Sequence, residues 1–497
     1  MALAKLRANL FRYLQTLSSG LRSRPYVKYS PRTAPQLLAA GYQAGGQGLS
    51  APRQSAWKLA LFAGPSMSLN TMLVPLLLLL PAFYSIEVGL DVAVIGNIFM
   101  FARVWDAITD PTIGALSDRT RTRWGRRRPW LIGALPLTLL ATWFLLNPPA
   151  DAGYLWLGLW LFLFYVFWTA MFIPYQSWGA ELATDFDERT RVAGYRDGAS
   201  FLGYLLAALL PLLVLQVFMG IEAPSYGQML VLVGLFFAIT LPVSTLLCVW
   251  RVTEPKPVET RPISWNDLFG IVVRNRPFQR LFVAYLFDRV GMGVYFAVMP
   301  LLIPLGLGLG KYFLALSVAI SIASLAFSPV WVRIAGKLGK HPSYCLANVV
   351  SIIAYAMFLW VPVGSQYWAL LTFIVLGIGN AGTLITAPSM MADCVDYDHL
   401  ESGVEQTGAH MACLWLITKI GFAMGIGIGL NFIGLYGFDG QAAIQSDSAV
   451  TALRIGTGGI PMLLLVPAIL IMLQFPLGRR RHAEIRRQLE ARGLDGG

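Results

Sequence analysis

The sequence has 497 residues, of which 56% are hydrophobic and only 13% are charged, and its mean hydropathy is +0.61. A typical soluble domain carries roughly 25% charged residues, so the composition excludes an ordinary soluble protein and indicates many membrane-spanning segments. We attribute the formal net charge of +12 to membrane topology and anionic lipid head groups, and we expect no nucleic-acid partner.

Residues 1–56 form a basic segment that contains no aspartate or glutamate. Its composition is similar to that of a transit peptide, and residues 3–17 also fit a basic amphipathic helix on the inner leaflet. A cytoplasmic tail without fixed structure is the interpretation that we favour. No cleavable secretory signal is evident.

Twelve apolar runs follow, each long enough to cross a hydrocarbon layer of about 30 Å. They cover residues 57–83, 92–117, 129–148, 154–180, 196–220, 227–250, 278–303, 311–334, 344–362, 367–392, 407–435 and 453–477. A connector rich in proline and charge, residues 251–277, divides them into two sets of six. We therefore predict an all-α membrane protein of two pseudo-symmetric six-helix bundles, residues 57–250 and 278–477, with a basic C-terminal tail at 478–497.

Lysine and arginine are concentrated in alternate loops and in both terminal segments. Positively charged loops stay on the cytoplasmic side of a membrane. We therefore expect a multi-pass protein of the cell inner membrane with both termini in the cytoplasm. Many secondary transporters are built from such paired halves, with the binding site near the midplane between them.

Three charged residues lie inside the second apolar run: Arg103, Asp106 and Asp110. An ionised group at bilayer depth costs at least about 2.5–3.5 kcal/mol on insertion scales, so such groups normally face a bundle interior or a wet cavity. Their i, i+3, i+7 spacing places all three on one stripe of a helix. This stripe is the first candidate for an ion or substrate site.

Several motifs resemble those of the glycoside-pentoside-hexuronide:cation symporter family, a branch of the major facilitator superfamily that includes the melibiose carrier. They are Gly114-x-Leu-x-Asp118-Arg119 with Gly125-Arg126-Arg127, Arg103-Val-Trp-Asp106 through Asp110-Pro111, Ile173-Pro174-Tyr175, and Ala392-Asp393-Cys-Val-Asp396-Tyr397. The resemblance covers about residues 57–475. It implies cation-coupled solute symport by alternating access.

The resemblance gives Asp106 and Asp110 the role of binding the coupling cation. Two carboxylates one turn apart repel each other when both are ionised, so a bound Na⁺ or a shared proton relieves the repulsion. Hard oxygen ligands suit an alkali cation. Thr109 either adds a hydroxyl ligand or bonds back to its own helix. For the aspartates, the alternative is a purely structural ion pair with Arg103 or Lys419.

Lys419 lies well inside the eleventh apolar run, where a buried amine must find a partner or lose its proton. By resemblance it matches the family's intramembrane lysine. Pairing with Asp106 or Asp110 across the two halves would let cation binding release the lysine and shift the conformational equilibrium. The alternative is that Lys419 reaches out to a membrane interface.

The expected substrate site departs from the melibiose carrier at several positions. Phe172 and Asn70 stand where that carrier has aspartates, and Gln176 replaces a tryptophan. Arg196 matches an arginine that helps to bind sugar, although a gate or head-group anchor is equally open. With Tyr175, these residues make a more apolar and more cationic lining. We rank a glycoside, pentoside or hexuronide first and an organic anion or lysolipid-like solute second.

Asp288 has no clear counterpart in the family, and we add it as a candidate substrate-binding carboxylate of the cavity. Adjacent helical residues point about 100° apart, so we expect Asp288 and its neighbour Arg289 not to face one site.

Charged residues near the cytoplasmic side are candidates for gating. Asp118, Arg119 and Arg126 belong to the motif from Gly114 to Arg127, which we call the signature loop, and Asp393 and Asp396 belong to an acidic loop opposite a basic surface. We expect a charge clasp between the halves that breaks as they rock. A merely solvated run of charges is the alternative.

Other classes of function are less well supported. The sequence shows no nucleotide-binding motif and no metal-ligand or nucleophile constellation, so we expect no enzyme activity, no cofactor beyond Na⁺ or H⁺, and a monomer in the lipid bilayer. A non-transporting sensor or a membrane-embedded enzyme on the same scaffold remains the alternative.

Overall fold

The computed structural model describes residues 54–182, 186–255, 265–404, 406–442 and 444–492. Within these ranges the named elements are helices, and twelve of them are long and apolar enough to cross a membrane. The predicted all-α membrane fold is confirmed in this part of the chain. The predicted N-terminal segment lies outside the described residues, except for its last three.

The first six spans run from α3 to α9. They are α3 (Ala56–Leu78) with its continuation α4 (Leu80–Ile86), α5 (Val92–Arg119), α6 (Arg128–Leu146), α7 (Tyr154–Glu181), α8 (Phe186–Pro211) with the π-helical η1 (Leu212–Phe218), and α9 (Tyr226–Arg251). Helix starts follow local chemistry. The Asp91 side chain caps the amides of Ala93 and Val94 at the start of α5.

The second six spans run from α11 to α17. They are α11 (Arg276–Leu301) with η2 (Leu302–Gly306), η3 (Gly310–Tyr312) with α12 (Phe313–Leu338), α13 (Lys340–Trp360), α14 (Gln366–Ser402), α15 (Thr407–Leu435), and α16 (Asp447–Arg454) with η4 (Ile455–Gly459) and α17 (Ile460–Met472). The connector contains α10 (Trp265–Arg274), and the C-terminal tail forms α18 (Arg479–Ala491).

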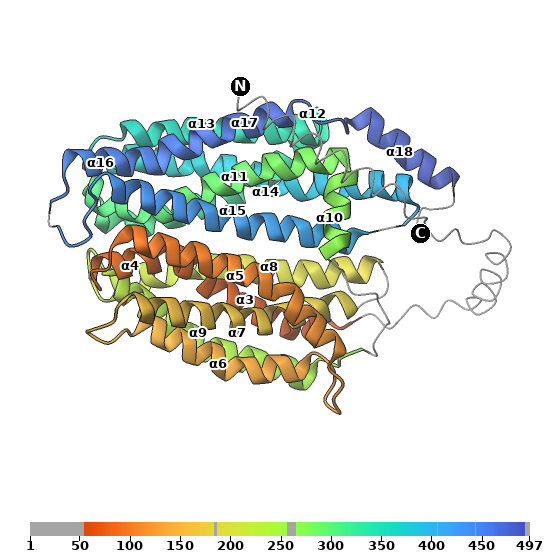
Figure 1. Ribbon diagram of the computed structural model, residues 1–497, viewed down its shortest axis with the longest axis horizontal. Coiled ribbons are helices and arrows are strands. Elements are labelled where there is room, and N and C mark those ends of the chain that lie inside the picture. Colours follow the sequence, from red (N-terminus) through yellow and green to blue (C-terminus); the bar gives the residue numbers. More distant parts are fainter. Residues whose placement is uncertain (1–53, 183–185, 256–264, 405, 443, 493–497) are drawn as a thin grey trace, which may run out of the picture. The chain divides into compact units, whose positions relative to one another are not determined.

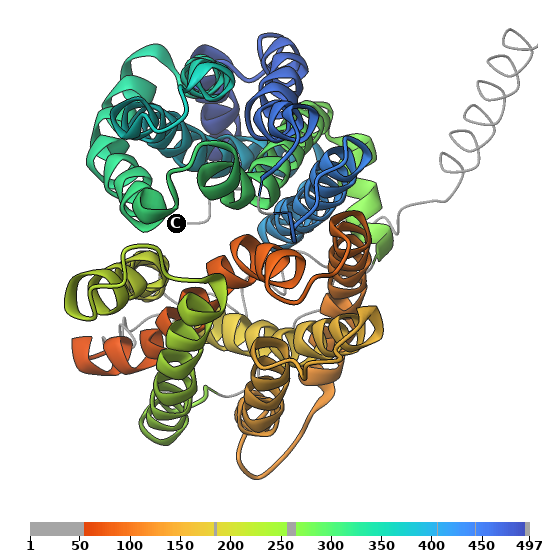
Figure 2. The same cartoon turned by 90° about the vertical axis from the view of Figure 1, so that its left-hand side faces the viewer.

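The helices form two groups that follow the chain, one from α3 to α9 and one from α11 to α17 (Figure 1). Within the first half α3 packs on α8 and α9, and within the second half α11 packs on α15 and α17. The halves meet where α5 runs along α15 and where α8 touches α12. Figure 2 shows the same two groups viewed along the helices. The midplane stripe on α5 therefore faces the other half.

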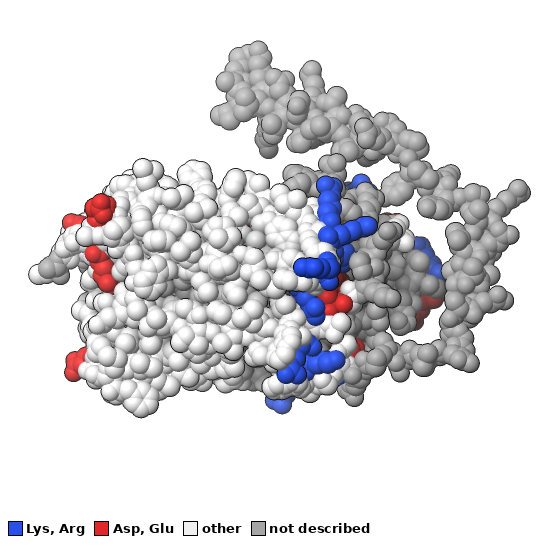
Figure 3. All heavy atoms as spheres, turned by 90° about the horizontal axis from the view of Figure 1, so that it is seen from below, with Lys and Arg blue, Asp and Glu red and all other residues white. Residues whose placement is uncertain are grey.

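Charged side chains divide between the two ends of the helices (Figure 3). Arginines and lysines gather at one end, which we call the basic end; Arg119, Arg251 and Lys337 lie there in the last turns of α5, α9 and α12. Acidic side chains mark the opposite, acidic end, where the helix bounds place Glu87, Asp91, Asp151, Asp439 and Asp447. This division agrees with the alternation of charge in the sequence.

The structure corrects one boundary that matters for function. The tenth predicted span ended at residue 392, but α14 continues to Ser402. No proline or glycine interrupts it between Ser389 and Ser402, and Gly403 ends it in a left-handed conformation with φ of +71°. Asp393 and Asp396 therefore lie on a helical extension at the basic end and not in a loop.

Candidate functional site

The charged stripe of α5 forms the centre of the site. Arg103 Nη1 lies 2.9 Å from Asp106 Oδ2, and both side chains are buried, with residue exposures of 7% and 0%. The Arg103 guanidinium also stacks over the Tyr165 ring at 4.9 Å. Arg103 and Asp106 thus form a buried pair on one helix, as the i, i+3 spacing allows.

Lys419 reaches this stripe from α15 in the other half. Its Nζ atom lies 2.9 Å from Asp106 Oδ2 and 2.6 Å from Asp110 Oδ2. Side-chain exposures are 15% for Lys419 and 22% for Asp110, so these two groups are more accessible than Asp106. One ammonium therefore ties both carboxylates of the first half to the second half.

Thr169 on α7 completes the group. Its hydroxyl lies 2.6 Å from Asp106 Oδ1 and 3.2 Å from Asp110 Oδ1. Sequence reasoning missed this residue, because a threonine 63 residues from Asp106 carries no signal in an apolar helix. Thr109, which the sequence offered as a ligand, instead donates to the backbone oxygen of Asp106 at 3.0 Å. In this conformation Thr109 takes the back-bonding alternative.

The charges of the site balance. Asp106 and Asp110 bring two negative charges, and Arg103 and Lys419 bring two positive ones. Arg103 is held by Asp106 inside one helix, whereas Lys419 belongs to the other half. If Lys419 withdraws, one net negative charge remains on the first half, with hydroxyl and carboxylate oxygens around it.

The predicted substrate residues of the first half are only partly brought together. Arg196 Nη1 on α8 donates to Gln176 Oε1 on α7 at 2.6 Å, and the amide of Asn70 donates to Ser200 Oγ at 3.1 Å. Ser200 follows Arg196 by one helical turn and bonds to its carbonyl. Arg196, Gln176 and Asn70 thus share a polar strip along α8.

Two further substrate candidates are differently placed. Tyr175 is fully buried, and its hydroxyl donates to the Phe62 carbonyl at 2.8 Å while its ring stacks on Phe62. Phe172 is partly buried against the same apolar core. In this conformation the ring and hydroxyl of Tyr175 are engaged in packing between α3 and α7.

Asp288 lies in the other half, away from that strip. Its carboxylate accepts from Arg289 Nη2 at 2.9 Å and from the Tyr344 hydroxyl at 3.2 Å. The expectation that Asp288 and Arg289 cannot face one site is wrong, because the long arginine side chain turns back toward its neighbour and stacks over Tyr285. The pair is buried between α11 and α13.

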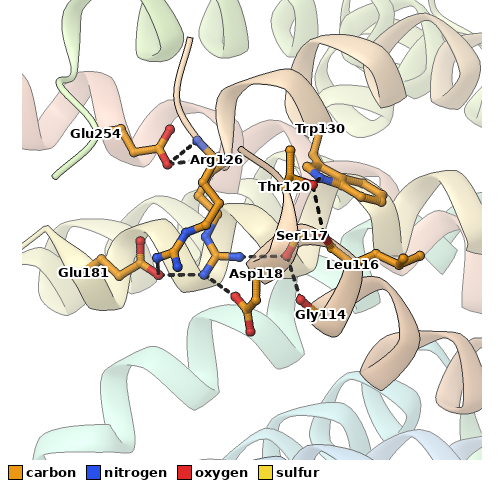
Figure 4. Close-up of polar contacts among 10 residues, drawn as sticks. Gly114, Leu116, Ser117, Asp118, Thr120, Arg126, Trp130, Glu181 and Glu254 are labelled. Atoms are coloured by element: carbon orange, nitrogen blue, oxygen red, sulfur yellow. Dashed lines mark hydrogen bonds and ion pairs between the residues drawn. The ribbon is translucent and has the colours of Figure 1, made fainter. Parts of the chain in front are cut away.

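The signature loop forms a charged network at the basic end of the first half (Figure 4). Arg127 Nη2 lies 2.6 Å from both Asp118 Oδ1 and Glu181 Oε1, and Arg126 Nη2 lies 2.8 Å from Glu181. Burial alone would lower the pKa of Arg127, but hydrogen bonds and charge from Glu181 and Asp118 raise it above its ordinary value. Arg127 is therefore a permanent charge that joins α5 to α7.

Glu254 anchors the same loop to the end of α9. Its Oε1 atom accepts from the backbone amides of Arg126 and Arg127 at 2.7 and 3.0 Å. Gly125 precedes them with φ of +109°, and a β-carbon there would collide with the Glu254 carboxylate. Sequence analysis named Asp118, Arg119 and Arg126 as gating candidates, gave Arg127 only as part of the motif, and missed Glu181 and Glu254. Arg119 is exposed.

The predicted clasp of Asp393 and Asp396 has a different set of partners. Asp393 Oδ1 lies 2.5 Å from Lys340 Nζ on α13, and His482 Nε2 on α18 lies 3.3 Å from Asp393 and 2.9 Å from Asp396. These partners belong to the same half as the aspartates. These contacts stabilise the basic end of the second half and do not join it to the first.

Comparison with known proteins gives a consistent result. Residues 61–479 match the family model described as MFS/sugar transport protein. The chain is 26% identical to an uncharacterised symporter of Synechocystis sp. over 86% of this chain and 95% of that protein. It is 24% identical to a glucuronide carrier protein homolog of Escherichia coli, over 82% and 90%.

More distant proteins add to this picture. The chain is 23% identical to the human sodium-dependent lysophosphatidylcholine symporter 1, over 82% of this chain and 80% of that one. Among solved structures, the nucleoside transporter NupG superposes with a TM-score of 0.59 at 12% identity, covering 85% of this chain and 100% of that chain. At this identity the structural match shows the fold alone.

Proposed function

This chain belongs to the MFS/sugar transport protein family of membrane transporters, and on that premise we propose that it is a symporter driven by one monovalent cation, Na⁺ or H⁺. The observation that carries the proposal is the bond of Lys419 to both Asp106 and Asp110 across the two halves. We also propose that the protein lies in the inner membrane of the cell with its basic end in the cytoplasm.

The cation site consists of Asp106, Asp110 and the Thr169 hydroxyl. Both carboxylates lie within reach of one ammonium and one hydroxyl, so a single cation that replaces Lys419 would find oxygen ligands already gathered. Because Arg103 already balances one carboxylate, one positive charge restores neutrality. This charge balance supports one monovalent cation per cycle.

Exchange of the cation for Lys419 supplies the coupling. Lys419 is on α15, so its bond to α5 stabilises the conformation in which the halves meet at this level. A cation that binds the carboxylates removes the need for that bond and thereby changes the relative free energies of the two conformations. Asp106 and Asp110 bind the cation, and Arg103 positions Asp106. Lys419 transmits the change in cation occupancy to the other half.

The solute site uses the polar strip of Arg196, Gln176 and Asn70. A guanidinium binds a carboxylate in a planar, two-bond geometry, and one relative is named a glucuronide carrier homolog. A hexuronide or related glycoside is therefore the first choice. A lysolipid-like solute is the second, because a guanidinium also binds phosphate and another relative is named a lysophosphatidylcholine symporter.

Uptake into proteoliposomes tests the proposal. We expect labelled methyl glucuronide to accumulate when an inward Na⁺ or H⁺ gradient is imposed, and labelled lysophosphatidylcholine to accumulate if the second choice is correct. A gradient of about tenfold stores about 1.4 kcal/mol, enough for about tenfold accumulation with one cation. Entry of either solute that is the same with and without both gradients would contradict symport and indicate facilitated diffusion, whereas no entry of either solute under either gradient would favour the sensor or enzyme alternative.

A further inference from the structure

The acidic end is closed by contacts between the halves. Asn97 on α5 faces Asn431 on α15, with Asn431 Nδ2 2.9 Å from Asn97 Oδ1 and the reverse pair at 3.5 Å. Within the described part of the chain, the other inter-half hydrogen bonds at this end are Tyr226 hydroxyl to Pro300 carbonyl at 2.5 Å, Gln216 amide to Lys311 carbonyl at 2.9 Å, and Gln441 amide to Ile86 carbonyl at 2.6 Å. All of them use neutral groups.

We propose that these residues form the outer gate of the transporter and that the Asn97–Asn431 pair is its central clasp. The proposal rests on the symport function only in taking alternating access as the reason for a gate. Among the described residues, no ion pair joins the halves at the acidic end, although Glu87, Asp439, Lys311 and Arg454 are present there. The gate is therefore held by amide, hydroxyl and carbonyl groups.

The clasp is oriented before the halves meet. The Asn431 amide also donates to the Gly427 carbonyl of its own helix at 2.8 Å, so one hydrogen is held by α15 and the other points to Asn97. A side chain already fixed by its own helix loses little further rotamer freedom when the partner arrives. Closing the gate then consists of docking two preformed surfaces.

Glycines allow the two helices to approach closely on both sides of the pair. A β-carbon at Gly96 would lie 2.8 Å from the Leu430 β-carbon, and one at Gly427 would lie 2.9 Å from the Met100 sulfur. Both distances are shorter than van der Waals contact, so a larger residue at Gly96 would push α5 and α15 apart, and one at Gly427 would displace the Met100 side chain. Small residues that let helices meet, combined with side-chain amides that bond across them, are a common way to associate helices in lipid.

The gate and the cation site lie on the same two helices at different depths. Asn97 precedes Asp106 on α5, and Asn431 follows Lys419 on α15. Below the gate, the link between the halves is charged and depends on the cation. At the gate, the link is neutral, so cation binding can release the lower link while the upper one sets how readily the acidic end opens.

The test measures gate opening directly. Spin labels at Leu155→Cys and Leu435→Cys occupy exposed positions on opposite halves at the acidic end, in a background without the four native cysteines. We expect Asn97→Ala with Asn431→Ala to raise the open-to-closed ratio by about tenfold, because two interhelical hydrogen bonds in lipid are lost. Asn147→Ala is the matched control, since the Asn147 side chain donates to the carbonyl of Trp143 on the adjoining helix α6, within the same half. An unchanged distance distribution in the double variant would overturn the proposal.

Two further readings keep the test decisive if that variant folds poorly. With thioether-linked labels attached after it has formed, a disulfide between Asn97→Cys and Asn431→Cys should hold the labels at the short distance until a reductant is added, and free opening of the oxidised protein would overturn the clasp. Raising the concentration of choline chloride should leave the open-to-closed ratio of the unsubstituted protein unchanged, because salt does not screen hydrogen bonds between neutral groups. A strong dependence of this ratio on salt would contradict a neutral gate. Neither measurement needs solute, so failure of uptake alone would count against symport and not against the gate.

Discussion

Replacement of Asp106 by Asn should lower the free energy of unfolding by about 3–5 kcal/mol, the usual cost of removing one partner from a buried ion pair. Asp106 is fully buried and accepts from Arg103, Lys419 and Thr169. The amide has no charge, so Arg103 would keep a buried positive charge without its carboxylate. Lys419 would still have Asp110.

Reversible unfolding in mixed micelles with increasing SDS, followed by tryptophan fluorescence, measures this loss. Asp110→Asn is the matched control, since it makes the same chemical change one turn away. It should cost much less, because Asp110 is more exposed and Lys419 keeps Asp106. Equal losses in the two variants would contradict the assignment of Asp106 as the fixed centre of the site.

Asp110→Asn should instead abolish gradient-driven accumulation while leaving the protein folded. Without Asp110, the charges of Arg103 and Lys419 exceed that of Asp106 by one, so a further cation would be repelled rather than bound. Accumulation of the solute should fall from about tenfold under a gradient of about tenfold to the level of simple equilibration. The solute should still exchange across the membrane, since the polar strip at Arg196 is intact.

The measurement compares gradient-driven uptake with exchange of labelled against unlabelled solute in the same proteoliposomes. Asp151→Asn, an exposed carboxylate at the acidic end, is the control and should behave like the original protein. Accumulation that persists in Asp110→Asn would show that this carboxylate does not couple the cation to the solute.

Much of the architecture could be predicted because membrane insertion leaves a strong signal in the chain. Apolar runs of bilayer length indicated the twelve spans, and the cost of burying charge drew attention to Arg103, Asp106 and Asp110. The contact of Lys419 with the stripe was also suggested by a similar argument, because a buried ammonium requires a partner.

Contacts between helices that are far apart in the sequence were harder to predict. Thr169 reaches the α5 stripe from α7, and Glu181 and Glu254 reach the signature loop from the end of α7 and from the segment after α9. Their local sequences give no sign of these contacts, since one hydroxyl or one terminal carboxylate is common in or beside any span. Arg289 showed another limit. Helical spacing fixes the direction of the β-carbon, but a long guanidinium side chain can turn back and bind its neighbour Asp288.

Placement of the substrate residues depended on details that a motif does not carry. Arg196 and Gln176 meet because α7 and α8 are adjacent at that level. Tyr175 immediately precedes Gln176 in the sequence, but its side chain packs against Phe62 on α3. Asp288 belongs to a buried pair in the other half. The proposed solute therefore rests on fewer residues than the cation site does.

In the proposed mechanism, the coupling cation and Lys419 compete for the same carboxylates, Asp106 and Asp110. The most direct test of this competition compares cation binding to Lys419→Gln and to the unsubstituted protein. Binding is followed as the shift of melting temperature with Na⁺ at pH 8 and with protons from about pH 8 to 5. Removing the competing ammonium should make the site bind its cation at a lower concentration, by about tenfold or more, and Asp110→Asn should abolish the shift. Equal or weaker cation binding in Lys419→Gln would contradict the competition and with it the proposed coupling.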